Sequence, residues 1–162
     1  MARTSKKSKT STRKKSPAGG GRKRGGRAKV GDATGKHLVI VESPTKARTI
    51  NKYLGKDYMV MASVGHVRDL PRRSRKGVRS RVPGVDLERD FEPTYDILPD
   101  KKKTISELRK AAKQAADVWF ATDLDREGEA IAWHLAEALG VDIAEAKRVV
   151  FNAITKSEIE HA

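Results

Sequence analysis

The sequence has no cysteine and no long run of apolar residues. The lack of cysteine excludes disulfides and zinc sites with cysteine ligands. No apolar segment approaches the roughly 18 residues of a membrane-spanning helix, and the amino-terminal stretch has no apolar core that would make it a secretory signal. By default we expect a soluble protein of the cytoplasm, with no membrane partner.

Acidic and large apolar residues are almost missing from the first 36 residues. This stretch holds 13 Lys and Arg residues and one acid, Asp32, a net charge of +12, whereas residues 37–162 carry only +2. Val30 is its only branched aliphatic residue, so it cannot bury enough apolar surface to offset chain entropy. We predict a disordered basic tail over residues 1–36. Such a polycation binds phosphate backbones without base specificity; a merely solvated tail or an organelle transit peptide is the alternative.

The rest of the chain alternates strand and helix patterns. Apolar, β-branched runs predict strands at 38–41, 58–64, 117–123 and 148–152. Helices are expected after a Ser43 cap with Pro44 first and Gly55 as the stop, over 103–116, from about Glu127 to Gly140, and over 155–162. Residues 65–100, rich in Pro and Gly, are expected to form an irregular insertion. The order predicts an α/β fold: a Rossmann-like, parallel sheet of about four strands flanked by helices, in one domain over 37–162. Because the last helix has barely begun at Ala162, we expect a fragment of a longer chain.

Four acids crowd into the segment that joins the third strand to its helix: Asp123, Asp125, Glu127 and Glu129. Ligands of open α/β sheets gather at the carboxyl ends of the strands, and acids two residues apart in an extended stretch point the same way. Asp123, Asp125 and Glu127 are therefore predicted to converge on a hard cation such as Mg²⁺. The alternative is that acids favour helix starts through the dipole, which would not explain Asp123 and Asp125. Glu129 is expected to be a solvated first-turn acid.

A second pair of charged residues follows the first strand. Glu42 and Lys46 are one helical turn apart, so they could form an ordinary ion pair. Because the acid cluster lies at the same edge of the sheet, a catalytic role is the second hypothesis. Lys46 would hold a phosphate oxygen at the helix start, and Glu42, crowded by carboxylates, would donate a proton. Arg126 could neutralise the acids or contact a phosphate.

The segments "LVIVESPTKARTINKYLG", "SVGHVRDLP" and "ATDLDREGEAIAWHL" resemble, in this order, the N-terminal TOPRIM domain of type IA DNA topoisomerases, and specifically their bacterial topoisomerase I branch. The resemblance covers nearly all of residues 37–162. "DLDREGE" alone would indicate TOPRIM, which primases and some nucleases share; "VESPTKA" and "GHVRDLP" narrow it to the topoisomerases.

The resemblance implies an ATP-independent, Mg²⁺-dependent enzyme that relaxes negatively supercoiled DNA by cutting one strand, passing the other and resealing. By motif position, Glu42 is similar to the general acid and a possible metal contact, and Lys46 to the phosphate-contacting lysine. Asp123, Asp125 and Glu127 are similar to the magnesium ligands. The implied partner is the DNA backbone at a single-stranded segment next to duplex, bound by a monomer associated with the nucleoid.

The nucleophilic tyrosine of this family lies in a separate downstream domain. Tyr53, Tyr58 and Tyr95 match no such motif. We therefore expect these 162 residues to be inactive alone and to depend on downstream domains of the same chain.

Several basic residues are candidate DNA contacts. His66 and Arg68, in "GHVRD", are expected near the DNA-facing cleft, although a lone histidine is as often a structural hydrogen-bonding group. The arginine-rich run 68–81 is either a solvated loop or a backbone contact that reads no sequence.

Three rival functions remain open from the residues alone. A TOPRIM nuclease or primase would use the same acids, and "VESPTKA" argues against it. A non-catalytic, receiver-like domain, which accepts a phosphoryl group on its acids, would need several acids after the first strand, where this sequence has only Glu42. A nucleic-acid-binding protein driven by its tail would lose function when residues 1–36 are deleted.

Overall fold

The computed structural model describes residues 32–74, 82–151 and 153–162. Its centre is a four-stranded, all-parallel sheet in the order β2-β1-β7-β8. The strands are β1 (His37–Val41), β2 (Tyr58–Ala62), β7 (Asp117–Phe120) and β8 (Lys147–Arg148). The predicted α/β fold with about four parallel strands is confirmed.

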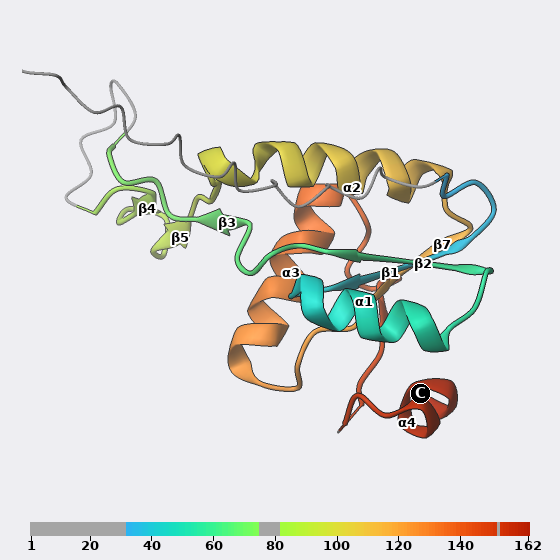
Figure 1. Ribbon diagram of the computed structural model, residues 1–162. Coiled ribbons are helices and arrows are strands. Elements are labelled where there is room, and N and C mark those ends of the chain that lie inside the picture. The colour runs from blue at the N-terminus through green and yellow to red at the C-terminus, as the bar shows by residue number, and fades with distance from the viewer. Residues whose placement is uncertain (1–31, 75–81, 152) are drawn as a thin grey trace, which may run out of the picture.

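Helices cover both faces of this sheet (Figure 1). They are α1 (Pro44–Tyr53), α2 (Lys102–Gln114), α3 (Arg126–Leu139) and α4 (Lys156–His161). In the view of Figure 1, α2 lies above the sheet and α1 and α4 lie below it. None of the helices within the described ranges is long and apolar enough to cross a bilayer.

The central strand β1 supplies both hydrophobic cores. Leu38 and Ile40 belong to the core that includes residues of α2 and α3, whereas Val39 and Val41 belong to the core that includes residues of α1 and α4. Successive strand side chains point to opposite faces, so a continuous apolar run suits a strand covered on both sides. The run therefore fixes β1 in the interior of a sheet.

Local sequence signals set the helix ends as expected. The Ser43 hydroxyl accepts a hydrogen bond from the Lys46 amide at 3.2 Å, and Pro44 is the first helical residue. Gly140 ends α3 with φ 72°, a left-handed conformation that glycine adopts without a Cβ penalty. Thr155 caps α4 by accepting from the Glu158 amide at 3.3 Å.

Three strands are shorter than the sequence predicts. β2 ends at Ala62 rather than at Val64, because Val64 and Gly65 have φ of 63° and 80°, which strand geometry does not allow. β7 ends at Phe120, three residues before Asp123. The fourth strand was expected over 148–152, but β8 pairs with β7 through only two residues and begins one residue earlier.

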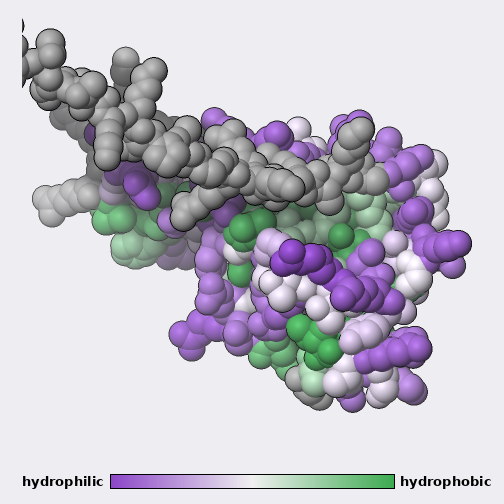
Figure 2. Space-filling view, viewed as in Figure 1, coloured by the Kyte–Doolittle hydropathy of each residue, from purple (hydrophilic) through white to green (hydrophobic). Residues whose placement is uncertain are grey.

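The insertion contains more structure than expected. Two small antiparallel sheets form from pairs of two-residue strands: β3 (Arg68–Asp69) with β6 (Asp96–Ile97), and β4 (Val85–Asp86) with β5 (Glu92–Pro93). A 3₁₀ turn, η1 (Pro99–Lys101), leads into α2. Figure 2 shows hydrophobic surface at the end of the molecule that carries β4 and β5, where Val82, Leu87 and Phe91 are exposed. Residues 75–81 lie outside the described residues.

The predicted tail lies outside the described residues as far as residue 31. Residues 32–36, which the sequence assigns to the tail, pack on the domain instead. Ala33 is fully buried, and the Gly35 amide donates to the Gln114 carbonyl at 3.1 Å. The packed unit therefore begins several residues before His37.

Candidate active site

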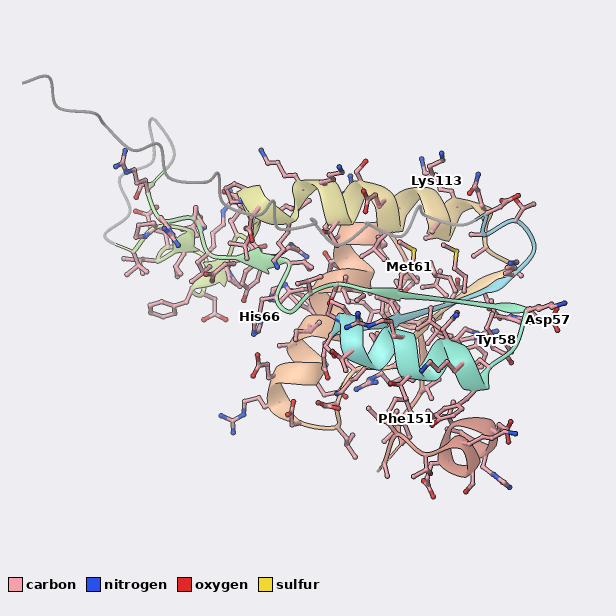
Figure 3. The ribbon with its side chains drawn as sticks, in the orientation of Figure 1. Asp57, Tyr58, Met61, His66, Lys113 and Phe151 are labelled. Atoms are coloured by element: carbon pink, nitrogen blue, oxygen red, sulfur yellow. The ribbon has the colours of Figure 1, made fainter. Side chains whose placement is uncertain are left out.

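The candidate site lies at the edge of the sheet where the parallel strands end. In Figure 3, Tyr58 marks the start of β2 and His66 lies just past its other end, beside α3. Glu42 follows β1 directly, and Asp123 follows β7 by three residues. Because β1 stands between β2 and β7, all three segments meet at the same edge, as the sequence predicts.

Three predicted site residues form one charged cluster. The Lys46 ammonium group donates to the Glu42 carboxylate and to the Asp123 carboxylate. The Asp123 amide donates to Glu42 Oε2 at 3.2 Å, so the loop after β7 is tied to the end of β1. The side chains of Glu42 and Lys46 are 16% and 18% exposed, whereas that of Asp123 is 52% exposed. The cluster therefore opens toward solvent on the side of Asp123.

The contacts of this cluster favour the charged forms of Lys46 and Asp123. Burial alone would lower the pKa of Lys46, but its hydrogen bonds to Asp123 and Glu42 outweigh this and leave the pKa raised. The pKa of Asp123 lies below its usual range, first because of the hydrogen bond from Lys46. Lys46 is thus a fixed cation between two carboxylates.

Asp125 has a local structural role that the sequence argument did not give it. It is the N-cap of α3, and its carboxylate accepts a hydrogen bond from the Gly128 amide at 2.6 Å. The argument that helix-start preferences would not explain Asp125 was wrong, because α3 begins at Arg126 and places Asp125 at the capping position.

Gly128 allows α3 to begin against the loop after β7. A Cβ at this position would stand 2.0 Å from the Asp123 carbonyl oxygen. The Gly128 carbonyl also accepts a hydrogen bond from the buried Thr122 hydroxyl at 2.7 Å. The glycine of "DREGE" therefore fixes how Asp123 sits beside the helix start.

Glu127 and His66 form a second contact at this edge. His66 Nε2 lies 3.0 Å from Glu127 Oε1, and both side chains are about half exposed or more. The contact joins the loop after β2 to the first turn of α3. His66 was predicted from its place after a strand, but its partner is 61 residues away and could not be read from the sequence.

Arg148 is a residue at this site that the sequence argument missed. Its guanidinium group donates to the carbonyls of Phe120, Val149 and Asp123 at 2.8–3.0 Å, and to the Glu129 carboxylate at 2.6 Å. Glu129 lies in the first turn of α3 with 54% of its side chain exposed, as expected, and the ion pair with Arg148 is an addition to that prediction. The one signal in the sequence was the position of Arg148 at the start of the predicted fourth strand.

Arg68 is enclosed by aromatic side chains. Its guanidinium carbon lies 5.5 Å from the Tyr95 ring centre and 5.6 Å from that of Trp133, and the side chain is only 15% exposed. The neighbouring His134 is buried, and this burial lowers its pKa. Arg68 therefore has a packing role between the insertion and α3, and a DNA contact by Arg68 stays a prediction.

The other basic candidates lie on the surface. Arg126 is the exposed first residue of α3. Arg72 and Arg73 are exposed, while the rest of the arginine-rich run lies in residues 75–81, outside the described residues. Contact of these residues with DNA remains a prediction.

The predicted metal ligands suit magnesium by chemistry but are not gathered around one point. Asp123, Asp125 and Glu127 offer only carboxylate oxygens, which Mg²⁺ prefers. Within the residues that the structure describes, no three acidic or histidine side chains are grouped so that they could hold an ion. Asp123 faces an ammonium group, Asp125 a backbone amide and Glu127 an imidazole. Each of these contacts uses one carboxylate oxygen and leaves lone pairs for a metal, but the three groups must move together before they can share one ion.

Comparison with known proteins gives a consistent family. Residues 37–154 match the Toprim domain. DNA topoisomerase 1 of Pseudomonas aeruginosa is 50% identical over 155 residues, covering 79% of this chain and 18% of that protein. DNA topoisomerase 1 of Escherichia coli is 49% identical over 149 residues, covering 79% of this chain and 17% of that protein.

A solved structure agrees with these relatives. Full-length topoisomerase I from Thermotoga maritima has a TM-score of 0.65 and 43% identity over 76% of this chain, which corresponds to 20% of that chain. The chain thus spans about a fifth of the length of the relatives it matches. It belongs to the Toprim domain family, and the bacterial relatives that it matches are named DNA topoisomerase 1.

Proposed function

We propose that this chain is the Toprim part of a type IA DNA topoisomerase, which relaxes negatively supercoiled DNA by single-strand cleavage, strand passage and rejoining without ATP. The observation that carries the proposal is the Glu42–Lys46–Asp123 cluster. A cation held between two carboxylates at the carboxyl edge of an α/β sheet is placed to meet a phosphate. The similarity to topoisomerases over most of the chain supports the same reading.

In this proposal Lys46 binds an oxygen of the scissile phosphate. Lys46 lies in the first turn of α1, where the positive end of the helix dipole also favours an anion. Glu42 is held beside it and, once its carboxylate has taken up a proton, gives that proton to the leaving 3′-oxygen, which makes cleavage of the strand easier. Arg126 and His66 border the same edge and contact the neighbouring backbone phosphates.

Asp123, Asp125 and Glu127 are the residues that would hold Mg²⁺. When bound, the ion supplies charge neutralisation and alignment of the two strand ends for rejoining. Asp123 is the most exposed member of the Glu42–Lys46–Asp123 cluster, with 52% of its side chain open to solvent, so an ion can reach its carboxylate. Glu42 is a further possible contact to the metal.

In this proposal the nucleophile is a tyrosine of a downstream domain, because the three tyrosines of these 162 residues are engaged elsewhere. Tyr58 packs against His37 at the far end of the sheet, with ring centres 5.1 Å apart. Tyr95 packs against His134 with ring centres 4.6 Å apart, and Tyr53 belongs to the core beside α1. The 162 residues are therefore expected to be inactive alone and to depend on downstream domains. We further propose that the complete protein acts as a monomer associated with the nucleoid.

The complete gene product tests the proposal. It is incubated with negatively supercoiled plasmid, with and without Mg²⁺, beside Glu42→Ala and the exposed control Glu88→Ala. We expect a Mg²⁺-dependent ladder of relaxed topoisomers for the parent and Glu88→Ala, and no ladder for Glu42→Ala or for residues 1–162. Nicked or linear plasmid without a ladder would instead assign the protein to the TOPRIM nucleases, the nearest alternative together with the primases.

A further inference from the structure

We infer that Lys101 is a positioning residue for this site. It holds the strained turn at Val64 and Gly65, and this turn places His66 beside Glu127. Its importance for DNA chemistry rests on the proposed function, while its effect on the turn does not. Lys101 lies in η1, at the end of the insertion and 37 residues from the turn that it contacts. It would act through the backbone and not on the substrate itself.

The turn after β2 has an unfavourable backbone. Val64 has φ 63° and the following Gly65 has φ 80°. Glycine adopts this region freely, but for a β-branched residue such as valine it is an outlier, because its Cβ crowds the backbone. Such a conformation persists only where surrounding contacts over-determine it. Since 48% of Val64 is exposed, packing of its own side chain does not supply enough of those contacts.

Lys101 supplies a contact to the strained residue itself. Its ammonium group donates to the Val64 carbonyl at 2.6 Å, a charge-assisted hydrogen bond. The Lys101 side chain is only 16% exposed, and the neighbouring Asp100 carboxylate lies 3.8 Å from the ammonium group. The lysine is thus held in place where it reaches the strained residue.

The turn is also tied to the rest of the site. The Gly65 amide donates to the Glu42 carbonyl at 2.9 Å, so the turn and the end of β1 move together. On the other side, Val67 is fully buried, and its carbonyl accepts from the Leu98 amide at 3.0 Å. His66 lies between these two anchors and projects from the end of β2 beside α3 (Figure 3).

The consequence falls on His66 and Glu127. With the turn fixed, His66 Nε2 reaches Glu127 Oε1 at 3.0 Å. If the Val64 carbonyl were released, the residue could relax to a negative φ, and the direction of the chain toward His66 would change. Through the Val64 carbonyl, Lys101 therefore links the end of the insertion to the contact between His66 and Glu127.

Hydrogen exchange and NMR of the 162-residue chain test this inference. Lys101→Met keeps the stem and removes the ammonium group; Lys103→Met makes the same change at an exposed position two residues away. We expect Lys101→Met to raise the exchange rate of the Gly65 amide by about tenfold and to shift the His66 ring signals. The Leu38 amide of the core should keep its protection, and Lys101→Arg, which retains a charged donor, should stay within about threefold of the parent.

A Gly65 exchange rate in Lys101→Met within about twofold of the parent, or equal changes in Lys103→Met, would overturn the inference. Should Lys101→Met not fold, Lys101→Gln carries the same expectation, because it replaces the charged donor by a shorter neutral one. Relaxation by the complete gene product gives a separate readout, in which Lys101→Met should slow turnover with little change in DNA affinity. If the parent shows no relaxation, the proposed function fails while the exchange data still decide the role of Lys101.

Discussion

Replacing Gly128 by alanine tests how closely the start of α3 packs against the backbone of Asp123 in the loop after β7. The added Cβ would stand 2.0 Å from the carbonyl oxygen of Asp123 and 2.9 Å from its carbonyl carbon. Both atoms belong to the backbone, so no side-chain rotation can relieve the contact. Either the start of α3 or the loop after β7 must shift.

The size of the effect follows from three contributions. Overpacking costs about 1–3 kcal/mol, and a contact this short to backbone belongs at the upper end. The shift also weakens the hydrogen bonds that Gly128 makes with Asp125 and Thr122, at about 1 kcal/mol each. The better helix propensity of alanine compared with glycine offsets about 1 kcal/mol of this loss. We expect Gly128→Ala to lower the free energy of unfolding by about 3–4 kcal/mol.

Urea denaturation, monitored by circular dichroism, measures this change in the free energy of unfolding. Ala130→Gly is the matched control. The control makes the reverse exchange two residues along the same helix, at a partly buried position, and should cost about 1 kcal/mol through the poorer helix propensity of glycine. If Gly128→Ala instead raised the free energy of unfolding by the amount that Ala130→Gly lowers it, the close approach of α3 to Asp123 would be refuted.

Two further predictions concern single carboxylates. Asp125→Ala should lower the free energy of unfolding by about 1 kcal/mol through loss of the cap, whereas Asp125→Asn should keep the cap but abolish Mg²⁺-dependent relaxation by the complete gene product; an active Asn variant would remove Asp125 from the proposed metal ligands. For Asp117, burial raises the pKa, but hydrogen bonds from three side chains, first that of Lys147, outweigh it and leave the pKa below the ordinary 3.8. Its ionised form therefore stabilises the fold above that value, and the stabilisation is lost as the pH falls through the lowered pKa. In urea denaturation, Asp117→Asn should be less stable than the parent near neutral pH and approach it in acid; a gap that persists below the lowered pKa would contradict this.

The sequence alone determined the architecture and which charged residues lie at the carboxyl edge of the sheet. The apolar run Leu38–Val41 required a strand covered on both faces, and Ser43 with Pro44 fixed the start of α1. Such signals act between residues close in the chain, where periodicity and capping chemistry are decisive. Since parallel strands end at one edge, Glu42 and Asp123 were predictable as neighbours.

Only the tertiary structure decided which side chains meet at that edge. Lys46 was expected to pair with Glu42, but its second contact, to Asp123, spans 77 residues. Arg148 reaches back 25 residues to the Asp123 carbonyl, and Lys101 reaches 37 residues to Val64. Contacts of this kind depend on how the elements pack, because a long side chain can reach any of several acceptors until the backbone around it is fixed. The sequence determined where the charge would gather, and packing determined which groups hold it.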